Sequence, residues 1–346
     1  MTTRVLFTHS FSTTPHLIQA LRDNPDRHPF EIFCTHHNPR SLQLHVADHA
    51  EVEPPLEGDA HAEYCLDLCR RHGIQVLVPG YRTIGWIAPH RAAFEAAGTR
   101  VVLAASADLI AILEDKAHTF GHLAGRELVT LPAHRFATDL DGFRTAHDAL
   151  VAEGHQICFK PVRAYGASGF RIIQEDLDPL RLFTQPPGVR IPLATVLATL
   201  GDAGAFPELM VMEYLPGAEY SLDCLALGGE LQVAIPRRKL DGRLRLLEDR
   251  PDLVELARRV TAALELSAAF NIQIRHGRDG VPKLLEINAR MSAGLYISNF
   301  SGVNVPYLAL RQSLGLPYTV PEPGLGRLVA EMEQAFLLDG VAVHQP

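Results

Sequence analysis

The chain has 346 residues, 47% of them hydrophobic, and a formal charge of −8, which predicts two or three soluble domains with sizeable cores. The acidic balance argues against general nucleic-acid binding, which relies on broad basic surfaces, although it leaves room for a local cationic pocket that binds a small anion. No apolar run approaches the length of a membrane span and the N-terminus has no signal-peptide profile, so we expect a cytoplasmic protein that binds no membrane. The five cysteines are odd in number and scattered, which favours reduced thiols.

Residues 4 to about 105 alternate between strands and helices, which predicts a small doubly wound α/β domain. The expected strands are 4–9, 30–34, 74–78 and 100–104, and the expected helices are 14–22, 60–72 and one that runs through Phe94. The turn at 9–14 lacks the three glycines of a dinucleotide fingerprint, so binding of NAD has little support. We expect this domain to contact a second substrate instead.

Fifteen of the seventeen histidines precede Lys160, so a metal site in that part has to be considered. His118 and His122 have helical spacing but no glutamate beside the first histidine, and His36 and His37 have no third ligand at a recognisable spacing. We therefore expect surface or packed histidines rather than a zinc site.

A helix is expected from Ser106 through Lys116 to about residue 123, followed by an α+β region. Residues 156–160 form a strand that ends at Pro161, and a loop with Gly166 and Gly169 leads into the next strand. Glycines allow backbone N–H groups to approach phosphate oxygens, so this loop suggests a phosphate flap, although the same spacing also fits a plain hairpin. Residues 184–208 are expected to be an excursion within this region.

The apolar strand at 209–215 carries Glu213 near its end. Such a carboxylate is either an edge residue in water or one of a few polar groups in an adenine slot. Further on, Arg237, Arg238 and Lys239 form either a solvated cationic run or a clamp for a transferred phosphate and an anionic substrate. A helix is expected at 252–264.

Residues 271–275 and 284–290 alternate between apolar and polar side chains around an Asp279-Gly280 turn, which predicts a β-hairpin. A two-residue turn there would pair Gln273 with Glu286 and Asn271 with Asn288, placing four oxygen-bearing side chains on one face. Mg²⁺ prefers such hard oxygen ligands and combines them with substrate phosphates. The same pattern also fits a solvated hairpin face.

These motifs, taken together and in order, resemble the ATP-grasp superfamily over nearly the whole chain. They are Asp115-Lys116, Phe159-Lys160-Pro161, Gly166-Ala-Ser-Gly169, Met212-Glu213-Tyr-Leu-Pro-Gly-Ala-Glu219, Asn271-Ile-Gln273 and Glu286-Ile-Asn288-Ala-Arg290. The strand with Asn-x-Gln ahead of Glu-x-Asn-x-Arg is similar to the carbamoyl-phosphate-synthetase and biotin-carboxylase branch. The chain also looks like the ATP-grasp proteins associated with tellurium-resistance operons. The resemblance implies an α/β and α+β protein in which two α+β subdomains clamp ATP. Its parts would be a pre-ATP-grasp doubly wound domain at 1–110, small and lid subdomains at 111–212, and a C-terminal metal-binding subdomain at 213–346.

The same resemblance implies a role for each matching residue. ATP would be bound by Lys116, Lys160, Gly166, Ser168, Gly169, Glu213, Tyr214, Leu215 and Glu219, with Glu219 on the ribose and Glu213 to Leu215 beside the adenine. Gln273, Glu286 and Asn288 would bind Mg²⁺ or Mn²⁺, and Arg290, Lys160 and Arg238 would be catalytic. Gln273 stands where many branches have an acidic residue, so the number of bound metal ions, one or two, stays open. The flap has fewer glycines than the biotin-carboxylase type.

The function this implies is an ATP-dependent ligase that joins a small-molecule carboxylate to an amine through an acylphosphate. Alternatives are an ATP-dependent kinase or carboxylase on the same scaffold, or a nucleotide-binding regulatory subunit without chemistry. The sequence leaves the substrates and the oligomeric state open, and a homodimer is a common assembly for such enzymes.

Overall fold

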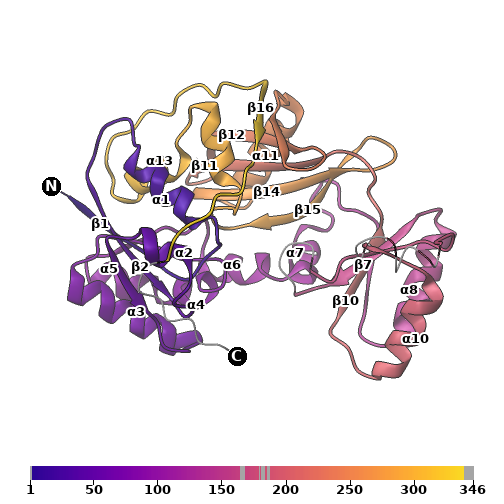
Figure 1. Cartoon of the computed structure of the whole chain (residues 1–346). Coiled ribbons are helices and arrows are strands. Elements are labelled where there is room, and N and C mark those ends of the chain that lie inside the picture. The colour runs from indigo at the N-terminus through magenta and orange to yellow at the C-terminus, as the bar shows by residue number, and fades with distance from the viewer. Residues whose placement is uncertain (1, 164–167, 179, 181–183, 185–187, 339–346) are drawn as a thin grey trace. The chain divides into compact units, whose positions relative to one another are not determined.

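The computed structural model describes residues 2–163, 168–178, 180, 184 and 188–338, and it has a mixed α/β architecture (Figure 1). Two compact units divide the chain. The first unit comprises Met1–Ala111, Glu219–Gln273 and Ile287–Pro346, and the second unit comprises Ile112–Ala218 and Ile274–Glu286. The chain therefore passes from the first unit to the second and back. It enters the second unit once more in the hairpin that was expected to carry the metal ligands, and then ends in the first unit.

The N-terminal part of the first unit is the doubly wound domain predicted from the alternation of strands and helices. Its sheet has the order β3-β2-β1-β4-β5, and all neighbours are parallel. The strands are β1 (Thr3–Phe7), β2 (Phe30–His36), β3 (His49–Val52), β4 (Val76–Val78) and β5 (Arg100–Val101), and the helices are α1 (Thr14–Arg22), α2 (Leu42–Val46), α3 (Gly58–His72), α4 (Ile84–Ile87), η1 (Ala88–His90) and α5 (Arg91–Ala96). Strand β3 and helix α2 were not predicted, because β3 is a short and largely exposed edge strand without apolar alternation.

The remaining part of the first unit is built on most of a six-stranded sheet with the order β15-β14-β11-β12-β13-β16, of which residues 274–276 of β14 and 282–286 of β15 belong to the second unit. Its strands are β11 (Glu219–Leu227), β12 (Glu230–Lys239), β13 (Leu244–Leu247), β14 (Ala268–His276), β15 (Pro282–Asn288) and β16 (Arg327–Ala330), and its helices are α11 (Pro251–Ala263), α12 (Leu295–Ser298), η2 (Asn299–Ser301) and α13 (Val305–Ser313). One apolar core joins the two sheets of this unit and includes Val5, Ile32, Ile235 and Tyr307. The N-terminal domain is thus packed as part of a larger body.

The second unit contains a five-stranded sheet with the order β6-β10-β7-β8-β9. The strands are β6 (His134–Ala137), β7 (Ile157–Pro161), β8 (Arg171–Ile173), β9 (Arg190–Ile191) and β10 (Leu209–Glu213), with helices α7 (Lys116–Leu123), α8 (Leu140–Ala152) and α10 (Leu193–Ala203). Alternation along β10 sends Leu209 and Val211 into the core beneath α8 and α10 (Figure 1) and Met210 and Met212 into a second cluster with Phe120. The region at 184–208 that was expected to be an excursion contains α10.

Two local predictions are wrong. The single helix expected from Ser106 to residue 123 is broken into α6 (Ala107–Leu113) and α7, because Asp115 leaves the helical conformation and caps α7. The hairpin turn has three residues rather than two: Gly277 N donates to Val281 O and Gly280, at φ 76°, donates to Gly277 O. Glycine tolerates this left-handed backbone. Next to this turn, the facing residues are therefore offset by one from those that a two-residue turn at Asp279-Gly280 would pair.

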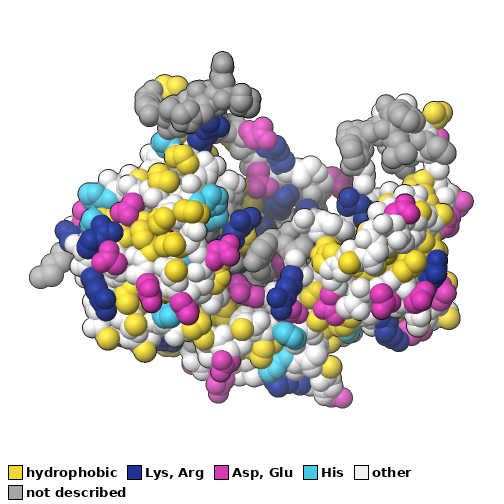
Figure 2. Space-filling model, turned by 90° about the horizontal axis from the view of Figure 1, so that it is seen from below, with side chains coloured by type: hydrophobic (Ala, Val, Ile, Leu, Met, Phe, Trp, Pro, Cys, Tyr) yellow, Lys and Arg dark blue, Asp and Glu magenta, His cyan; other side chains and the backbone are white. Residues whose placement is uncertain are grey.

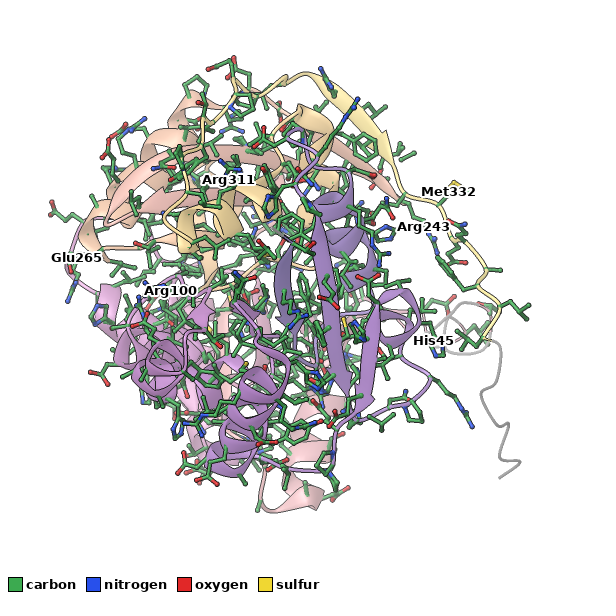
Figure 3. All side chains as sticks on the ribbon, turned by 90° about the vertical axis from the view of Figure 1, so that its left-hand side faces the viewer. His45, Arg100, Arg243, Glu265, Arg311 and Met332 are labelled. Atoms are coloured by element: carbon green, nitrogen blue, oxygen red, sulfur yellow. The ribbon has the colours of Figure 1, made fainter. Side chains whose placement is uncertain are left out.

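On the face drawn in Figure 2, basic and acidic side chains are interspersed and neither sign gathers into a broad patch. Within the residues that the structure describes, no helix is long and apolar enough to cross a membrane. The exposed Met332 and the Arg243 side chain, which pairs with Glu333, lie along the C-terminal segment (Figure 3).

Candidate functional site

A lysine and a carboxylate from segments far apart in the sequence meet in the second unit. The Asp115 side chain accepts the N–H groups of Ala117 and His118 at 2.9 and 3.1 Å, so α7 begins at Lys116. Lys116 is buried, and its Nζ lies 3.7 Å from Glu286 Oε2 and 3.5 Å from Val162 O. Two residues that the sequence predicted for phosphate and metal binding therefore lie side by side.

The N-cap of α7 is also tied to the start of the predicted flap. Arg163 Nε donates to Asp115 Oδ2 at 2.8 Å from a side chain that is 79% exposed. Burial alone would raise the pKa of Asp115, but the Arg163 hydrogen bond and the His118 N–H outweigh it and lower that pKa. Gly166 lies outside the described residues, whereas Ser168 and Gly169 are exposed. A Cβ on Gly169, whose φ is +71°, would come within 2.6 Å of Pro161 Cδ, so this turn requires glycine.

Lys160 lies on β7 opposite Met210 of β10, on the sheet face that carries the cluster of Phe120, Met210 and Met212. Tyr214 and Leu285 are partly buried against the same cluster, and Leu215 is 2% exposed. The Tyr214 ring also lies 5.6 Å from the Arg275 guanidinium. Lys160, Tyr214 and the apolar cluster thus share one side of the sheet, which suits a base that stacks on apolar groups beside a cation.

Glu213 is buried, so of the two environments considered from the sequence the one in water is wrong. Its carboxylate is 6% exposed and accepts hydrogen bonds from Lys283 Nζ at 2.7 and 2.9 Å and from the Ala133 N–H at 2.8 Å. Strand alternation turns this side chain to the face opposite Met212. The carboxylate is therefore committed to a buried ion pair. Sequence reasoning missed Lys283, because one lysine in a hairpin strand carries no signal of burial.

In the first unit, Asp223 is fully buried and collects donors from three elements. Oδ1 accepts Asn271 Nδ2 and Ser292 Oγ, both at 2.8 Å, and Oδ2 accepts Ser298 Oγ at 2.6 Å and Arg237 Nη2 at 3.2 Å. Asn271 was expected on an open polar face and is instead completely buried in this network. Asp223 carried no sequence signal, because an isolated aspartate in a strand is most often exposed.

The predicted cationic run separates along β12. Arg237 is buried against Asp223, whereas the Arg238 side chain is 38% exposed and lies 3.7 Å from Glu248. Alternation along the strand explains the difference. The Lys239 side chain is exposed and its Nζ lies 3.7 Å from Glu219 Oε1. The inward-facing cation is therefore Arg237, and the sequence had favoured its neighbour.

Arg290 lies against the N-terminal domain. Its Nη2 donates to Asn288 Oδ1 at 2.7 Å, and its guanidinium lies 4.9 Å from the Phe11 ring and 5.8 Å from the Tyr81 ring. These two rings stack on each other at 4.3 Å. Gln273 is half-buried on β14. Phe11 and Tyr81 were not predicted, since single aromatic residues in loops carry little signal.

Three histidines meet at the carboxyl edge of the N-terminal sheet. The ligand nitrogens of His9, His36 and His37 lie within 4.8 Å of one another. No third ligand for His36 and His37 was predicted from the sequence, and the fold brings His9, which follows β1, beside them. Burial, reinforced by His36 and His37, lowers the pKa of His9 to about 4, so this imidazole is neutral at pH 7.

A cavity of about 750 Å³ lies elsewhere in the first unit, beside α1 and α13, where His16, Tyr296 and Tyr307 line it. Among the described residues, none that was predicted for ATP or metal binding lines it. The predicted ATP and metal residues that the fold brings together are instead Lys116 and Glu286.

The comparisons with known proteins fit this architecture. Solved ATP-grasp enzymes share the fold: the biotin carboxylase domain of 2-oxoglutarate carboxylase from Hydrogenobacter thermophilus, in complex with MgADP and bicarbonate, is 16% identical with a TM-score of 0.66, over 94% of this chain and 73% of that one. Residues 205–335 match the family described as "ATP-grasp in the biosynthetic pathway with Ter operon". The chain therefore has the ATP-grasp fold.

Two further ATP-grasp structures cover most of the chain. N5-carboxyaminoimidazole ribonucleotide synthetase from Thermotoga maritima is 16% identical with a TM-score of 0.60, over 94% of this chain and 79% of that one. L-amino acid ligase from Bacillus licheniformis is 14% identical with a TM-score of 0.61, over 90% of this chain and 74% of that one. No curated protein matches the sequence. At these identities the likeness concerns the fold.

Proposed function

We propose that this ATP-grasp protein is a ligase that uses Mg-ATP to join a carboxylate to an amine through an acylphosphate. The observation that carries the proposal is the pair of Lys116 Nζ and Glu286 Oε2, 3.7 Å apart and largely removed from water. A cation beside a carboxylate is the minimum that a metal–triphosphate site requires: the carboxylate for the divalent ion and the lysine for the phosphate oxygens.

The donor set fits Mg²⁺ or Mn²⁺. Glu286 and Asn288 are two residues apart on β15 and so point to the same side of the strand, and both offer oxygen, as does Gln273. With a single carboxylate, this set resembles sites in which the nucleotide supplies further oxygens. The ion would neutralise charge on the transferring phosphoryl group.

The other predicted residues take roles consistent with their positions. Lys116 and Lys160 would bind the phosphates, and Gly166, Ser168 and Gly169 would cover them. The main chain at Glu213, Tyr214 and Leu215 would contact the adenine, because the Glu213 carboxylate is held by Lys283. Glu219 would hold the ribose. Arg290 would orient and stabilise the transferred group, and Arg237 is better placed than Arg238 for an inward-facing charge.

A carboxylate does not react with an amine at neutral pH, so activation by phosphate transfer is the chemical reason for ATP. The residues above would align the attacking carboxylate with the γ-phosphate and exclude water from the acylphosphate. The amine would then attack the acyl carbon, the tetrahedral intermediate would expel phosphate, and the amine proton would leave to solvent. We further propose a cytoplasmic enzyme that works as a homodimer.

The test is phosphate release from Mg-ATP in a matrix of amino acids and small carboxylates, with hydroxylamine added to trap an acylphosphate as a hydroxamate. We expect release that depends on a carboxylate, and a hydroxamate from the same carboxylate. Glu286→Gln should reduce turnover by at least about 100-fold with an unchanged circular dichroism spectrum, and Glu255→Gln, on an exposed side chain of α11, should not. A stable phosphorylated product would indicate a kinase, bicarbonate consumption a carboxylase, and full turnover by Glu286→Gln would refute its metal role.

A further inference from the structure

We propose that His9, His36 and His37, none of which was assigned to ATP or Mg²⁺, form a binding site for a transition-metal ion of the Zn²⁺ type. Their ligand nitrogens lie within 4.8 Å of one another, and two of the three residues are buried. Imidazole nitrogens select Zn²⁺, Co²⁺, Ni²⁺ or Cu²⁺, whereas Mg²⁺ and Ca²⁺ prefer oxygen. The proposal does not rest on the proposed ligase function.

The parallel sheet brings the three histidines together. Phe7 of β1 pairs with Cys34 of β2, so the register places His9 level with His36, and His37 follows directly. Both positions are at the carboxyl ends of their strands, the edge at which open α/β sheets bind ligands. Sequence spacing alone could not reveal this set, because the pairing of β1 with β2 decides it.

The distance between the Nδ1 atoms of two of the histidines is close to the distance between two nitrogen ligands of one metal ion. His9 Nδ1 and His37 Nδ1 are 3.0 Å apart and share a hydrogen bond. Two nitrogen ligands of tetrahedral Zn²⁺, each at 2.0–2.1 Å, are about 3.3 Å apart. A metal ion could thus replace the shared proton with a small outward movement of His37, which is exposed and able to move.

A buried carboxylate lies beside the three rings. Glu53 is 6% exposed, its Oε1 is 3.7 Å from His9 Nδ1, and its Oε2 is 3.4 Å from His61 Nε2. It can orient a ligand histidine or hold a water bound to the metal ion, as carboxylates beside histidine ligands commonly do.

The backbone that carries the histidines is held in place. The buried Gln43 side chain donates to Thr8 O and Thr35 O at 3.3 and 2.8 Å and so joins the residues that precede His9 and His36. Gly80 lies so close that a Cβ there would be 1.8 Å from His9 O. His36 Nδ1 accepts the N–H of the exposed Asn38 at 2.9 Å. If His36 binds the metal through Nδ1, this hydrogen bond is lost as well as the one between His9 and His37, and the released N–H of Asn38 turns to water.

The test is titration of the full chain, freed of metal by a chelator, with Zn²⁺ in a calorimeter and with Co²⁺ in a spectrophotometer, in the absence of nucleotide. We expect one tightly bound Zn²⁺ per chain and the visible absorption of tetrahedral Co²⁺. His37→Gln should weaken Zn²⁺ binding by more than about 10-fold, since even the partners of metal ligands contribute that much. His37 is exposed, so this variant should fold, and an unchanged melting temperature without metal would confirm it.

The matched control is His45→Gln, on the exposed histidine of α2 (Figure 3), which should bind Zn²⁺ like the unmodified chain. Glu286→Gln should also bind it normally, because Glu286 is not one of the proposed ligands. No saturable Zn²⁺ binding, or equal binding by His37→Gln and the unmodified chain, would overturn the proposal. His9→Gln should abolish binding too, and its folding can be checked by circular dichroism.

Discussion

Replacement of Asp223 by asparagine tests the buried network of the first unit. The carboxylate is fully buried and its nearest charged partner, the Arg237 guanidinium, is 7% exposed. Each oxygen already accepts from donors, so the new amide NH₂ faces a donor in either orientation. On one side it meets Asn271 Nδ2 and Ser292 Oγ, and on the other Ser298 Oγ and Arg237.

The expected cost follows from these contacts. Loss of one partner of a buried ion pair typically costs about 3–5 kcal/mol, because the remaining charge stays buried and uncompensated. Asn271 Oδ1 is buried without a hydrogen-bond partner, so a flip of this amide can accept from the new NH₂ and recover roughly 1 kcal/mol. That flip turns Nδ2 away from Leu222 O. We therefore expect the free energy of unfolding to fall by about 3 kcal/mol.

The assay is urea unfolding followed by fluorescence of the single tryptophan, Trp86 in α4, which reports on the first unit. Asp252→Asn is the control, since Asp252 forms a surface pair with Arg250 at 2.6 Å and its side chain is 54% exposed; such a pair contributes about 1 kcal/mol or less. Equal losses for the two variants would refute the reasoning. In a double-mutant cycle, adding Arg237→Met to Asp223→Asn should cost less than the sum of the single changes.

Three further predictions concern backbone, charge and thiols. Gly80→Ala should destabilise the protein by at least about 3 kcal/mol, because the new Cβ would lie 1.8 Å from His9 O. Gly121→Ala in α7, where a Cβ meets nothing within 4 Å, should instead stabilise the protein by about 0.5–1 kcal/mol. Thermal melts that rank the two variants alike would contradict this. Asp115→Ala should lose about 1–2 kcal/mol of stability, because the helix cap is removed. The folded pKa of Asp115 is lowered, so the stability that its charge contributes is present above about pH 4 and is lost as the pH falls through the folded pKa. Asp115→Asn should therefore show a weaker acid dependence of stability in melts from pH 2 to 7. Burial raises the pKa of every cysteine, to about 12 for Cys69 and Cys158. A thiol reagent at pH 8 should therefore react with the five thiols only as the protein unfolds. A thiol that reacts quickly in the native protein would contradict the burial of all five cysteines.

Local patterns were sufficient for most elements. Alternation of apolar residues located β1, β2, β4 and β14 and the helix α11, and the order of the motifs indicated the ATP-grasp fold, because hydrophobic period and turn residues act over a few positions. The errors occurred where a tertiary contact overrides local preference. Asp115 lies between two helices because its carboxylate accepts the N–H groups of Ala117 and His118 and so begins a new helix, and the apolar pattern alone does not show this.

The candidate site divides in the same way. Sequence motifs predicted Lys116 and Glu286, and the second unit places their charged atoms 3.7 Å apart. The sequence did not show that Arg237 rather than Arg238 turns inward, since a one-residue choice of strand face depends on which side of the sheet is covered. Lys283 and Asp223 were missed because a charged residue shows its burial only through the partners that surround it.

The sequence by itself determined the class of fold, most of the strands and helices of the N-terminal domain, and the set of residue types suited to a metal–triphosphate site. Tertiary structure alone decided which side chains are neighbours across distant segments: the pair of Glu213 with Lys283, the Asp223 network, and His9 with His36 and His37. The physical reason is that periodicity is a local property of the chain, whereas strand pairing and burial are set by contacts between segments that a sequence does not order.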